Sequence, residues 1–343
     1  MNKVSIIVPC YNSARCVEKA ITSLKEQTYG EIEVIVIDDG SDDTTLDAAR
    51  RAAQNDGRFV FVSLEHAGVS NARNHGIKIA TGEYLMFLDA DDRYSENGVE
   101  KLVRAADRYK ADIVSGGLVK TRNSKKIAHM TPTVEGVFSD KQKETVLRKA
   151  CIGNDPALCS FIDKLYRTEF IRDNNIFFPD IISGEDSVFA LDAMMACDSI
   201  AFLKDNDFYL YEQNPESFTK KNIAIEERIS LSDIFFGGME RIIKKYGRED
   251  LLVCLDSRKA LAIYDFLMKI AERSDVGSAE KKKMIKAVAD NPYYAKGLDR
   301  DALSYQALNV RFLVSEVLKK HILRAYFTAL FIKTLKKLAG KSA

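Results

Sequence analysis

The sequence predicts an α/β protein: a mixed, mostly parallel sheet flanked by helices, followed by an all-helical C-terminal region. Over the first 115 of the 343 residues, short apolar runs alternate with helical patterns, which is typical of βαβ units. These runs are continuously apolar, as expected for strands that are buried on both faces. From about residue 223 the pattern is helical almost throughout.

The individual elements follow from the same patterns. Apolar, β-branched runs predict strands at 4–8, 34–37, 59–63, 84–88 and 112–116. Apolar residues at helical spacing predict helices at 13–27, 43–54 and 69–80, and another that ends near residue 109. Residues 117–220 are less regular. We therefore expect one domain over 1–220, with parts 1–115 and 116–220, and a helical region over 221–343.

The bulk composition argues against several classes of protein. A formal net charge of +1 does not favour nucleic-acid binding by the whole chain. The six cysteines form no CxxC pair, so we interpret them as reduced thiols and not as a disulfide frame or a zinc site. No apolar run has the length of a signal peptide or a spanning helix. We expect a cytoplasmic protein.

Three acids follow the predicted strand 84–88, in the segment FLDADD. Like charges this close repel each other, and burial raises the cost of keeping them ionised. Asp89 and Asp91, two residues apart at a strand exit, would suit a hard divalent cation such as Mg²⁺ or Mn²⁺. The alternative is that these acids cap the next helix, beside Ser95.

A second acidic cluster, VIVIDDGSDDTT, follows the predicted strand 34–37. A tight turn at Gly40 and a helix cap at Asp42 explain part of it. The adjacent pair Asp38 and Asp39 is explained less well, and a carboxylate there could accept hydrogen bonds from a base or a ribose. A response-regulator pocket would need a further strand-end acid, but Asp56 lies in a polar loop.

The segment GVSNARNHGIKIATG precedes the fourth predicted strand. Ser70 or Asn71 can begin a helix whose first turn carries Arg73. A helix N-terminus with an arginine suits a diphosphate. The alternative is an ordinary surface arginine on an amphipathic helix.

Together these segments resemble the family 2 inverting glycosyltransferases with the GT-A fold. The resemblance depends on four motifs in order, VSIIVPCYN (4–12), VIVIDDGSDD (34–43), GVSNARNHGI (68–77) and FLDADD (87–92). It continues more weakly through IDKLYR (162–167), FPD (178–180), GED (184–186) and YLYEQNPESFT (209–219), and there it is similar to enzymes of bacterial capsular, exo- or lipopolysaccharide synthesis. Asp163 stands where the family usually has asparagine before KLY.

The resemblance implies a nucleotide-sugar donor, and uridine diphosphate is the commonest nucleotide in the family. It implies that Asp39 binds the uracil or its ribose with Asp38 beside it, and that Arg73 faces the diphosphate. The residues expected to line the nucleotide pocket are Pro9, Tyr11 and Asn12.

The resemblance also implies the catalytic groups. Asp89 and Asp91 would form the DxD motif, with Asp91 as the main ligand of Mn²⁺ or Mg²⁺ and Asp89 holding the ribose or a metal-bound water. Asp186 would be the base that accepts the proton of the acceptor hydroxyl, and Glu185 would position it or the acceptor. The alternative for these two acids is a favourable helix N-terminus.

Three later residues match positions that often face the site in such polysaccharide enzymes. These are Lys164, Gln213 and Ser217.

Residues 309–341 contain eight lysines and arginines but a single acid, Glu316. A basic amphipathic helix is typical of a membrane-surface element. We expect peripheral contact with the inner face of the membrane, which suits a glycan acceptor carried on polyprenyl diphosphate. The alternative is a helix that packs on its own domain with a solvated basic face.

Two other functions could use some of the same residues as a glycosyltransferase. A haloacid-dehalogenase-like phosphatase also uses a strand-end DxD, but its nucleophilic Asp would follow the first strand, which here ends in PCYN. A non-catalytic nucleotide-sugar-binding scaffold would not need Asp186. The sequence leaves the sugar, the acceptor and the linkage open.

Overall fold

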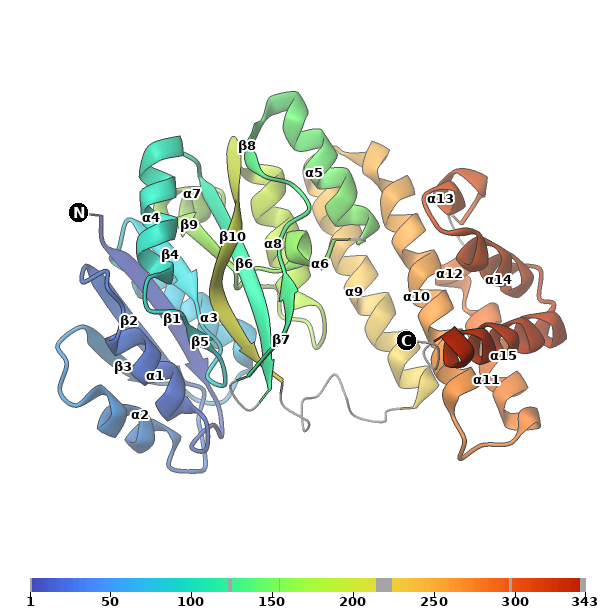
Figure 1. Cartoon of the computed structure of the whole chain (residues 1–343), viewed down its shortest axis with the longest axis horizontal. Helices are drawn as coiled ribbons and strands as arrows, with labels where there is room; N and C mark the ends of the chain where they lie inside the picture. Colours follow the sequence, from blue (N-terminus) through green and yellow to red (C-terminus); the bar gives the residue numbers. More distant parts are fainter. Residues whose placement is uncertain (1, 123–124, 154, 214–223, 296–297, 340–343) are drawn as a thin grey trace. The chain divides into compact units, whose positions relative to one another are not determined.

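The computed structural model describes residues 2–122, 125–153, 155–213, 224–295 and 298–339 (Figure 1). The chain forms two compact units. One contains Met1–Ala150 and Asn154–Lys221, and the other contains Cys151–Gly153 and Asn222–Ala343. The division of the sequence into domains stays a prediction, and each unit is described by itself.

The first unit is built on a sheet with the strand order β3-β2-β1-β4-β9-β6-β10-β5. Its first four strands are parallel and confirm the expected βαβ pattern: β1 (Val4–Cys10), β2 (Ile32–Asp38), β3 (Phe59–Ser63) and β4 (Tyr84–Phe87). Every residue of β1, β2 and β4 is buried, which is why these strands read as unbroken apolar runs.

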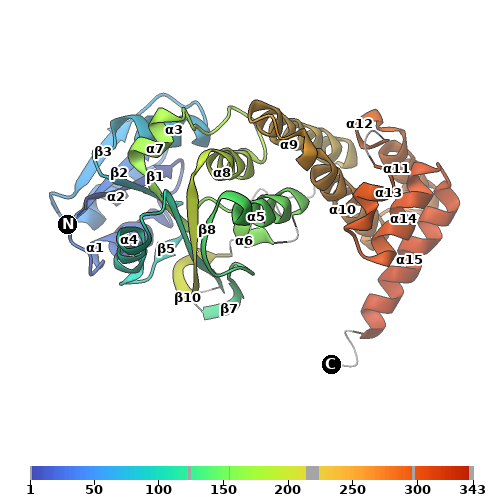
Figure 2. The same ribbon diagram turned by 90° about the horizontal axis from the view of Figure 1, so that it is seen from above.

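Helices cover both faces of this sheet. Figure 2 shows α3 and α7 on one face and α1 and α4 on the other. α3 packs on β1 and β2, whereas α4 packs on β6 and β10. The helices are α1 (Val17–Lys25), α2 (Thr45–Ala53), α3 (Val69–Ile79), α4 (Gly98–Tyr109) and α7 (Thr168–Asp173).

The irregular stretch after residue 112 supplies the other half of the sheet. β6 (Ile113–Arg122) runs parallel to β10 (Ser199–Glu212), and β9 (Lys164–Arg167) lies antiparallel between β4 and β6. The remaining elements that precede α9 (Ile225–Lys245) are β5 (Arg93–Tyr94), β7 (Lys125–Met130), β8 (Gly136–Ser139), α5 (Asp140–Ile152), α6 (Pro156–Cys159) and α8 (Glu185–Ala196).

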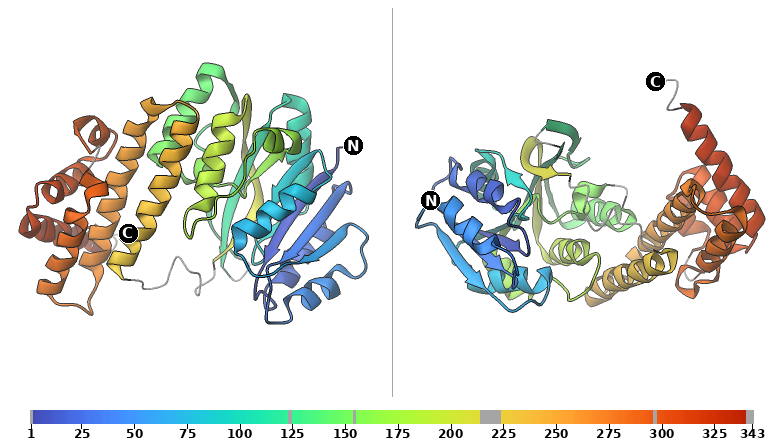
Figure 3. Two further views of the ribbon diagram at one scale, coloured as in Figure 1. Left: turned by 180° about the vertical axis from the view of Figure 1, so that it is seen from behind. Right: turned by 90° about the horizontal axis from the view of Figure 1, so that it is seen from below.

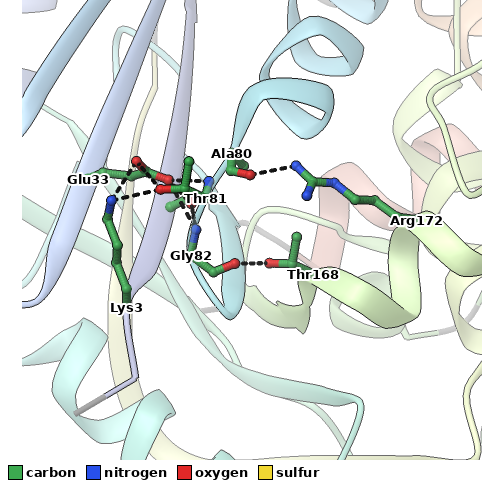
Figure 4. A network of polar contacts seen from close by, with 8 residues as sticks. Lys3, Glu33, Ala80, Thr81, Gly82, Thr168 and Arg172 are labelled. Carbon is green, nitrogen blue, oxygen red and sulfur yellow. Dashed lines mark hydrogen bonds and ion pairs between the residues drawn. The ribbon is translucent and has the colours of Figure 1, made fainter.

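The C-terminal end of α3 is fixed by polar contacts from several elements (Figure 4). On β2, the Glu33 carboxylate accepts hydrogen bonds from Lys3, Ser5 and Thr81. The Arg172 guanidinium donates to the carbonyls of Ile77 and Ala80, 2.6 Å away in each case. A guanidinium at this position satisfies carbonyls that have no partner inside the helix and complements the helix dipole.

The second unit is helical, as the sequence predicts. Within it α10 packs against α9, α11, α14 and α15, and α15 also packs against α11 and α14 (Figure 3). Its elements are α9 (Ile225–Lys245), η2 (Glu249–Leu251), α10 (Leu252–Glu272), α11 (Ser278–Asp290), α12 (Pro292–Ala295), α13 (Arg300–Ser304), α14 (Leu308–Leu318) and α15 (Ile322–Ala339).

All six cysteines are free thiols. Among the helices that the structure describes, none has both the length and the apolar character needed to cross a bilayer.

Candidate functional site

The polar segments that follow β1, β2 and β4 lie at one edge of the sheet. The strands are parallel neighbours, with Cys10 opposite Asp38 and Ile7 opposite Phe87. The backbone bond from Asp39 N to Cys10 O, at 2.9 Å, continues the ladder beyond β2. Ligands of open α/β sheets bind beyond such carboxyl ends, so this edge is the candidate site.

Asp39 is almost fully buried and organises the loop between β3 and α3. Its carboxylate accepts hydrogen bonds from the backbone N–H groups of Ala67, at 3.0 Å, and Gly68, at 2.9 Å. The Nδ1 atom of His66 lies 2.9 Å from the same carboxylate. The two N–H groups and the imidazole already occupy part of the hydrogen-bonding capacity of the Asp39 carboxylate. Its expected contact with a base or ribose stays a prediction.

Asp38 stabilises the turn that follows β2. Its carboxylate accepts a hydrogen bond from Ser41 Oγ at 2.5 Å and lies 3.5 Å from Ser63 Oγ. Gly40 has a φ of +70°, and a Cβ at that position would lie 2.7 Å from the backbone nitrogen of His66. The turn chemistry expected from the sequence therefore explains Gly40 and also explains most of the contacts of Asp38.

The three residues expected to line the nucleotide pocket have different surroundings. Pro9 is buried within β1. Asn12 has a φ of +47° and joins two loops, because its Oδ1 accepts the N–H of Asp42 at 3.0 Å. Tyr11 is 42% exposed. Of these residues, only Tyr11 presents a large apolar surface to a ligand.

The Tyr11 ring stacks on the imidazole of His66, with the ring centroids 4.2 Å apart and the planes at 18°. We did not single out His66 from the sequence, because the histidines have no ligand spacing. The feature of the sequence that could have pointed to His66 is its position, three residues beyond the end of β3. In the structure it lies beside the turn at Gly40.

The three acids after β4 have three different surroundings. Asp89 pairs with Arg73 at 2.8 Å. Asp92 is fully buried and accepts hydrogen bonds from Tyr209 Oη, at 2.6 Å, and from the N–H of Glu212, at 2.8 Å. It therefore holds β10 against this turn. Unlike Asp89, the Asp91 side chain has no ion pair with another side chain among the described residues, and it is half-buried.

The surroundings of Asp91 fit a divalent cation. Burial raises the pKa of its carboxyl group, and the nearby charge of Asp89 raises it further. A bound cation would relieve both effects. No group of three or more His, Cys, Asp or Glu side chains with metal-site geometry occurs in the described ranges. One or two carboxylates still suit Mg²⁺ or Mn²⁺, which commonly keep waters and substrate phosphates as their other ligands.

Arg73 lies at the centre of the site and is only 5% exposed. Its guanidinium lies 2.8 Å from Asp89 and 3.4 Å from Glu185. It also lies over the rings of Phe161 and Phe178, 4.5 and 5.1 Å from their centroids. Burial alone would lower the pKa of Arg73, but the charge and hydrogen bond of Asp89, together with the charges of Glu185 and Asp186, outweigh burial and raise it. The sequence led us to expect Arg73 to face a diphosphate, whereas its guanidinium is paired with protein carboxylates.

Glu185 and Asp186 begin α8, after Gly184 in a left-handed conformation with φ 81°. Burial raises the pKa of Glu185, the neighbouring Asp186 raises it further, and Arg73 offsets part of the rise. One oxygen of Asp186 accepts the N–H of Ser187 at 2.6 Å. Since Arg73 contacts both Asp89 and Glu185, it joins the DxD turn to the start of α8.

Lys164 does not face the site, so this expectation is wrong. Its side chain is 1% exposed and forms an ion pair with Asp163 at 2.7 Å. The ammonium also donates to the carbonyls of Ala157, at 3.0 Å, and Ser160, at 2.5 Å. Asp163 supplies the charge that a buried ammonium requires, which gives a physical reason for the departure from the usual asparagine.

The other two later positions are less informative. Gln213 donates its N–H to Thr121 O and accepts a hydrogen bond from Arg122 Nη2, both at 2.8 Å. Ser217 lies outside the described residues.

The family described as Glycosyl transferase family 2 matches residues 5–173. That range contains β1 to β4, the acids of the DxD turn, Arg73 and β9. This part of the chain therefore belongs to the family 2 glycosyltransferases.

Particular relatives show how far the likeness extends. Glycosyltransferase EpsJ of Bacillus subtilis is 35% identical over 221 residues, which are 63% of this chain and 63% of EpsJ. The match thus spans less than two thirds of that relative.

Solved structures extend the likeness to the fold of nearly the whole chain. The structure of S. aureus TarS 1–349 in complex with UDP-GlcNAc has a TM-score of 0.71 at 22% identity and covers 95% of this chain and 90% of that one. The mannosyltransferase PcManGT of Pyrobaculum calidifontis, in complex with GDP-Man and Mn²⁺, has a TM-score of 0.51 at 18% identity and covers 93% of this chain and 86% of that one. Both show that the fold is shared.

Proposed function

We propose that the protein is an inverting glycosyltransferase that moves a sugar from a nucleotide diphosphate, a UDP-sugar, to a hydroxyl group of a growing bacterial surface glycan. The observation that carries the proposal is the contact of one buried arginine, Arg73, with both acidic motifs, at 2.8 Å to Asp89 and 3.4 Å to Glu185. These motifs belong to the donor and acceptor sides of such a site.

On the donor side, Tyr11 offers an exposed ring for a base, and Asp39 lies beside it across the ends of β1 and β2. TarS, which shares the fold, has been crystallised with UDP-GlcNAc and with UDP, and this supports uridine as the base. Pro9 and Asn12 shape the loop that carries Tyr11. Asp38 maintains the adjoining turn.

We propose Asp91 as the principal carboxylate for a divalent cation, Mn²⁺ or Mg²⁺, with Asp89 near it. Such a cation, when bound, stabilises the charge that develops on a departing diphosphate. The chain itself contributes a half-buried carboxylate, Asp91, and a second carboxylate, Asp89, whose orientation is fixed by Arg73.

On the acceptor side, we propose that Asp186 accepts the proton of the attacking hydroxyl as the bond to the anomeric carbon forms. Attack from the face opposite the nucleotide inverts the configuration, through an oxocarbenium-like transition state as in glycoside hydrolysis. Glu185, paired with Arg73, would hold the start of α8 and thereby position Asp186.

We propose that the acceptor is a glycan carried on a polyprenyl diphosphate lipid, and that the protein acts in the cytoplasm at the inner face of the membrane. The concentration of basic residues in 309–341 supports contact with that surface.

The rival functions account for less of the structure. In a phosphatase with a nucleophilic Asp after the first strand, β1 would have to lead into that Asp, but β1 ends at Cys10 and is followed by Tyr11 and Asn12. A binding scaffold would need the donor side alone, whereas here Arg73 joins that side to Glu185.

Calorimetric titration of UDP into the whole chain, with and without Mn²⁺, tests the donor site. We expect binding that requires the metal and is lost in Asp91→Asn. Asp186→Asn serves as the matched control and should bind UDP as the wild type does. Metal-independent binding in both variants would contradict the assigned cation site, and no binding by the wild type would contradict the uridine donor.

A further inference from the structure

Helices α14 and α15 carry an unusual concentration of exposed apolar side chains. Among the described residues, the phenylalanines that are exposed all lie on these two helices: Phe312 at 58%, Phe327 at 62% and Phe331 at 64%. Leu308, on α14, is 79% exposed. A surface phenylalanine is normal when single, but a contiguous group marks an interaction surface.

The exposed large apolar side chains of α15 repeat every four residues. Leu323, Phe327, Phe331 and Leu335 are 57%, 62%, 64% and 48% exposed, and this spacing aligns them along one side of the helix. We name these four residues the α15 stripe.

The α15 stripe is not the face that holds α15 in its unit. Ala325, Tyr326 and Ala329 of the same helix are buried, and α15 packs against α10, α11 and α14. The Lys333 ammonium donates to Ala271 O, on α10, at 3.0 Å. Ala325, Tyr326 and Ala329 thus face inward and the four stripe residues face outward, so internal packing does not account for the stripe.

The sequence around the α15 stripe is strongly basic, with eight lysines and arginines against one acid in 309–341. Arg324 and Lys320 are largely exposed, with side-chain exposures of 74% and 67%, and Lys320 pairs with Asp290 of α11 at 3.0 Å. Glu316, the single acid of 309–341, is buried and contacts His321 at 3.1 Å. An apolar surface with basic neighbours is complementary to a leaflet of anionic lipid, where acyl chains and negative headgroups are offered together.

We propose that the α15 stripe lies in the interfacial region of a membrane leaflet that contains anionic lipid. A second copy of the chain is a poorer occupant, because a twofold contact through this surface would bring two basic regions together. The contact is peripheral, since none of the described helices is suited to cross a membrane. The inference deepens the proposed membrane location by naming the surface and the lipid chemistry, but it does not depend on the donor site.

Co-sedimentation of the full chain with lipid vesicles tests the proposal. We expect binding to vesicles of phosphatidylcholine with phosphatidylglycerol and little binding to phosphatidylcholine alone. The affinity of the double variant Phe327→Ser, Phe331→Ser for the anionic vesicles should be lower than that of the wild type by about tenfold or by a larger factor. The matched control is Val60→Ser, which removes an apolar side chain that is 45% exposed on β3 in the other unit.

A second variant separates lost binding from lost folding. Arg324→Glu leaves the apolar stripe intact and should also weaken binding to anionic vesicles. The difference in affinity between this variant and the wild type should be smaller at high salt. Circular dichroism and UDP binding of each variant report whether its fold is kept. Because UDP binding is measured separately, failure of the lipid contact and failure of the donor assignment are distinguishable.

Three results would overturn the proposal. One is a wild-type chain that does not sediment with anionic vesicles. Another is a folded Phe327→Ser, Phe331→Ser variant that binds as the wild type does. The third is a wild-type dimer in sedimentation velocity that this variant abolishes, because the α15 stripe would then be an interface between two copies.

Discussion

The guanidinium of Arg73 lies 2.8 Å from the carboxylate of Asp89 and is almost completely buried. Its other side lies 3.4 Å from Glu185, so one cation connects the turn after β4 with the start of α8. Arg73 is therefore best understood as a positioning residue. It fixes the carboxylate beside the proposed metal ligand Asp91 and the carboxylate beside the proposed base Asp186.

Arg73→Lys should lower kcat about 10- to 100-fold with a smaller change in KM for the donor, because small displacements of catalytic groups have effects of this size. A single ammonium cannot reproduce the planar contact with two carboxylates and two rings. Steady-state kinetics with a UDP-sugar measure this. Lys78→Ala, an exposed site on the same helix, is the control. A change confined to KM would instead indicate a direct donor contact by Arg73.

Glu185→Gln should change the pH dependence of the rate. Burial and the neighbouring Asp186 raise the pKa of Glu185, so its ionised form, which pairs with Arg73, is lost at a higher pH than for an ordinary glutamate. In the wild type, activity should therefore fall early on the acid side. The variant should have a lower kcat at neutral pH, where Glu185 of the wild type is ionised, and a flatter acid limb. An unchanged acid limb in the variant would show that another group controls it.

Gly40→Ala should lower both stability and donor affinity. The residue has a φ of +70°, and a Cβ would lie 2.7 Å from the His66 backbone nitrogen, so the loop beside Tyr11 must shift. Gly247→Ala is a matched control, since Gly247 has a φ of +61° but nothing within 4 Å of its Cβ position. The control should lose about 1 kcal/mol from backbone strain alone, whereas Gly40→Ala should lose more. Equal losses in urea unfolding would contradict the steric argument.

Glu33→Gln should destabilise the fold at neutral pH by roughly 2 kcal/mol, the cost of weakening hydrogen bonds to a charged group. Burial alone would raise the pKa of Glu33, but hydrogen bonds from Lys3, Ser5 and Thr81 outweigh it and lower the pKa to about 2. Because the folded pKa is lowered, this stabilisation is present above the unfolded value of 4.5 and is lost as the pH falls toward 2.

The difference in unfolding free energy between the wild type and Glu33→Gln should therefore shrink between those two pH values. Glu31→Gln, an exposed site just before β2, is the control. A difference that does not depend on pH would show that the network in Figure 4 acts through packing and not through charge.

Lys164→Met should destabilise the protein by about 3 kcal/mol or more, since it leaves Asp163 as an unpaired buried charge. Below its unfolding temperature the variant should bind UDP as the wild type does, because the Lys164 ammonium is directed at Asp163 and backbone carbonyls. Thermal unfolding and calorimetry measure the two effects. A stable variant with weak UDP binding would show that Lys164 contributes to the donor site.

The parallel half of the sheet was predictable because β1, β2 and β4 are buried on both faces and β3, at the sheet edge, is a short β-branched and aromatic run. β3 begins and ends where its apolar run predicts, and β1 extends two residues further, through Pro9 and Cys10. The antiparallel strand β9 was not predictable, because it is inserted between β4 and β6 by pairing over long sequence distances. No local pattern reports such pairing.

For the candidate site, motif positions were predictable but side-chain environments were not. Strand order brings the ends of β1, β2 and β4 together, as the alternation implies. Whether an acid faces a ligand or the protein depends on distant partners, such as Tyr209 for Asp92. The burial of Lys164 and the pairing of Arg73 with Glu185 likewise depend on contacts that periodicity does not encode.

The most direct test of the account is UDP release from a panel of UDP-sugars by the wild type and by Asp186→Asn, with UDP affinity measured in parallel. We predict that at least one UDP-sugar is turned over in the presence of Mn²⁺ or Mg²⁺, and that Asp186→Asn keeps UDP affinity but loses turnover. Equal turnover by the two proteins would contradict the assignment of Asp186 as the base. Tight UDP binding without turnover of any UDP-sugar, even when acceptor glycans are supplied, would favour a binding scaffold.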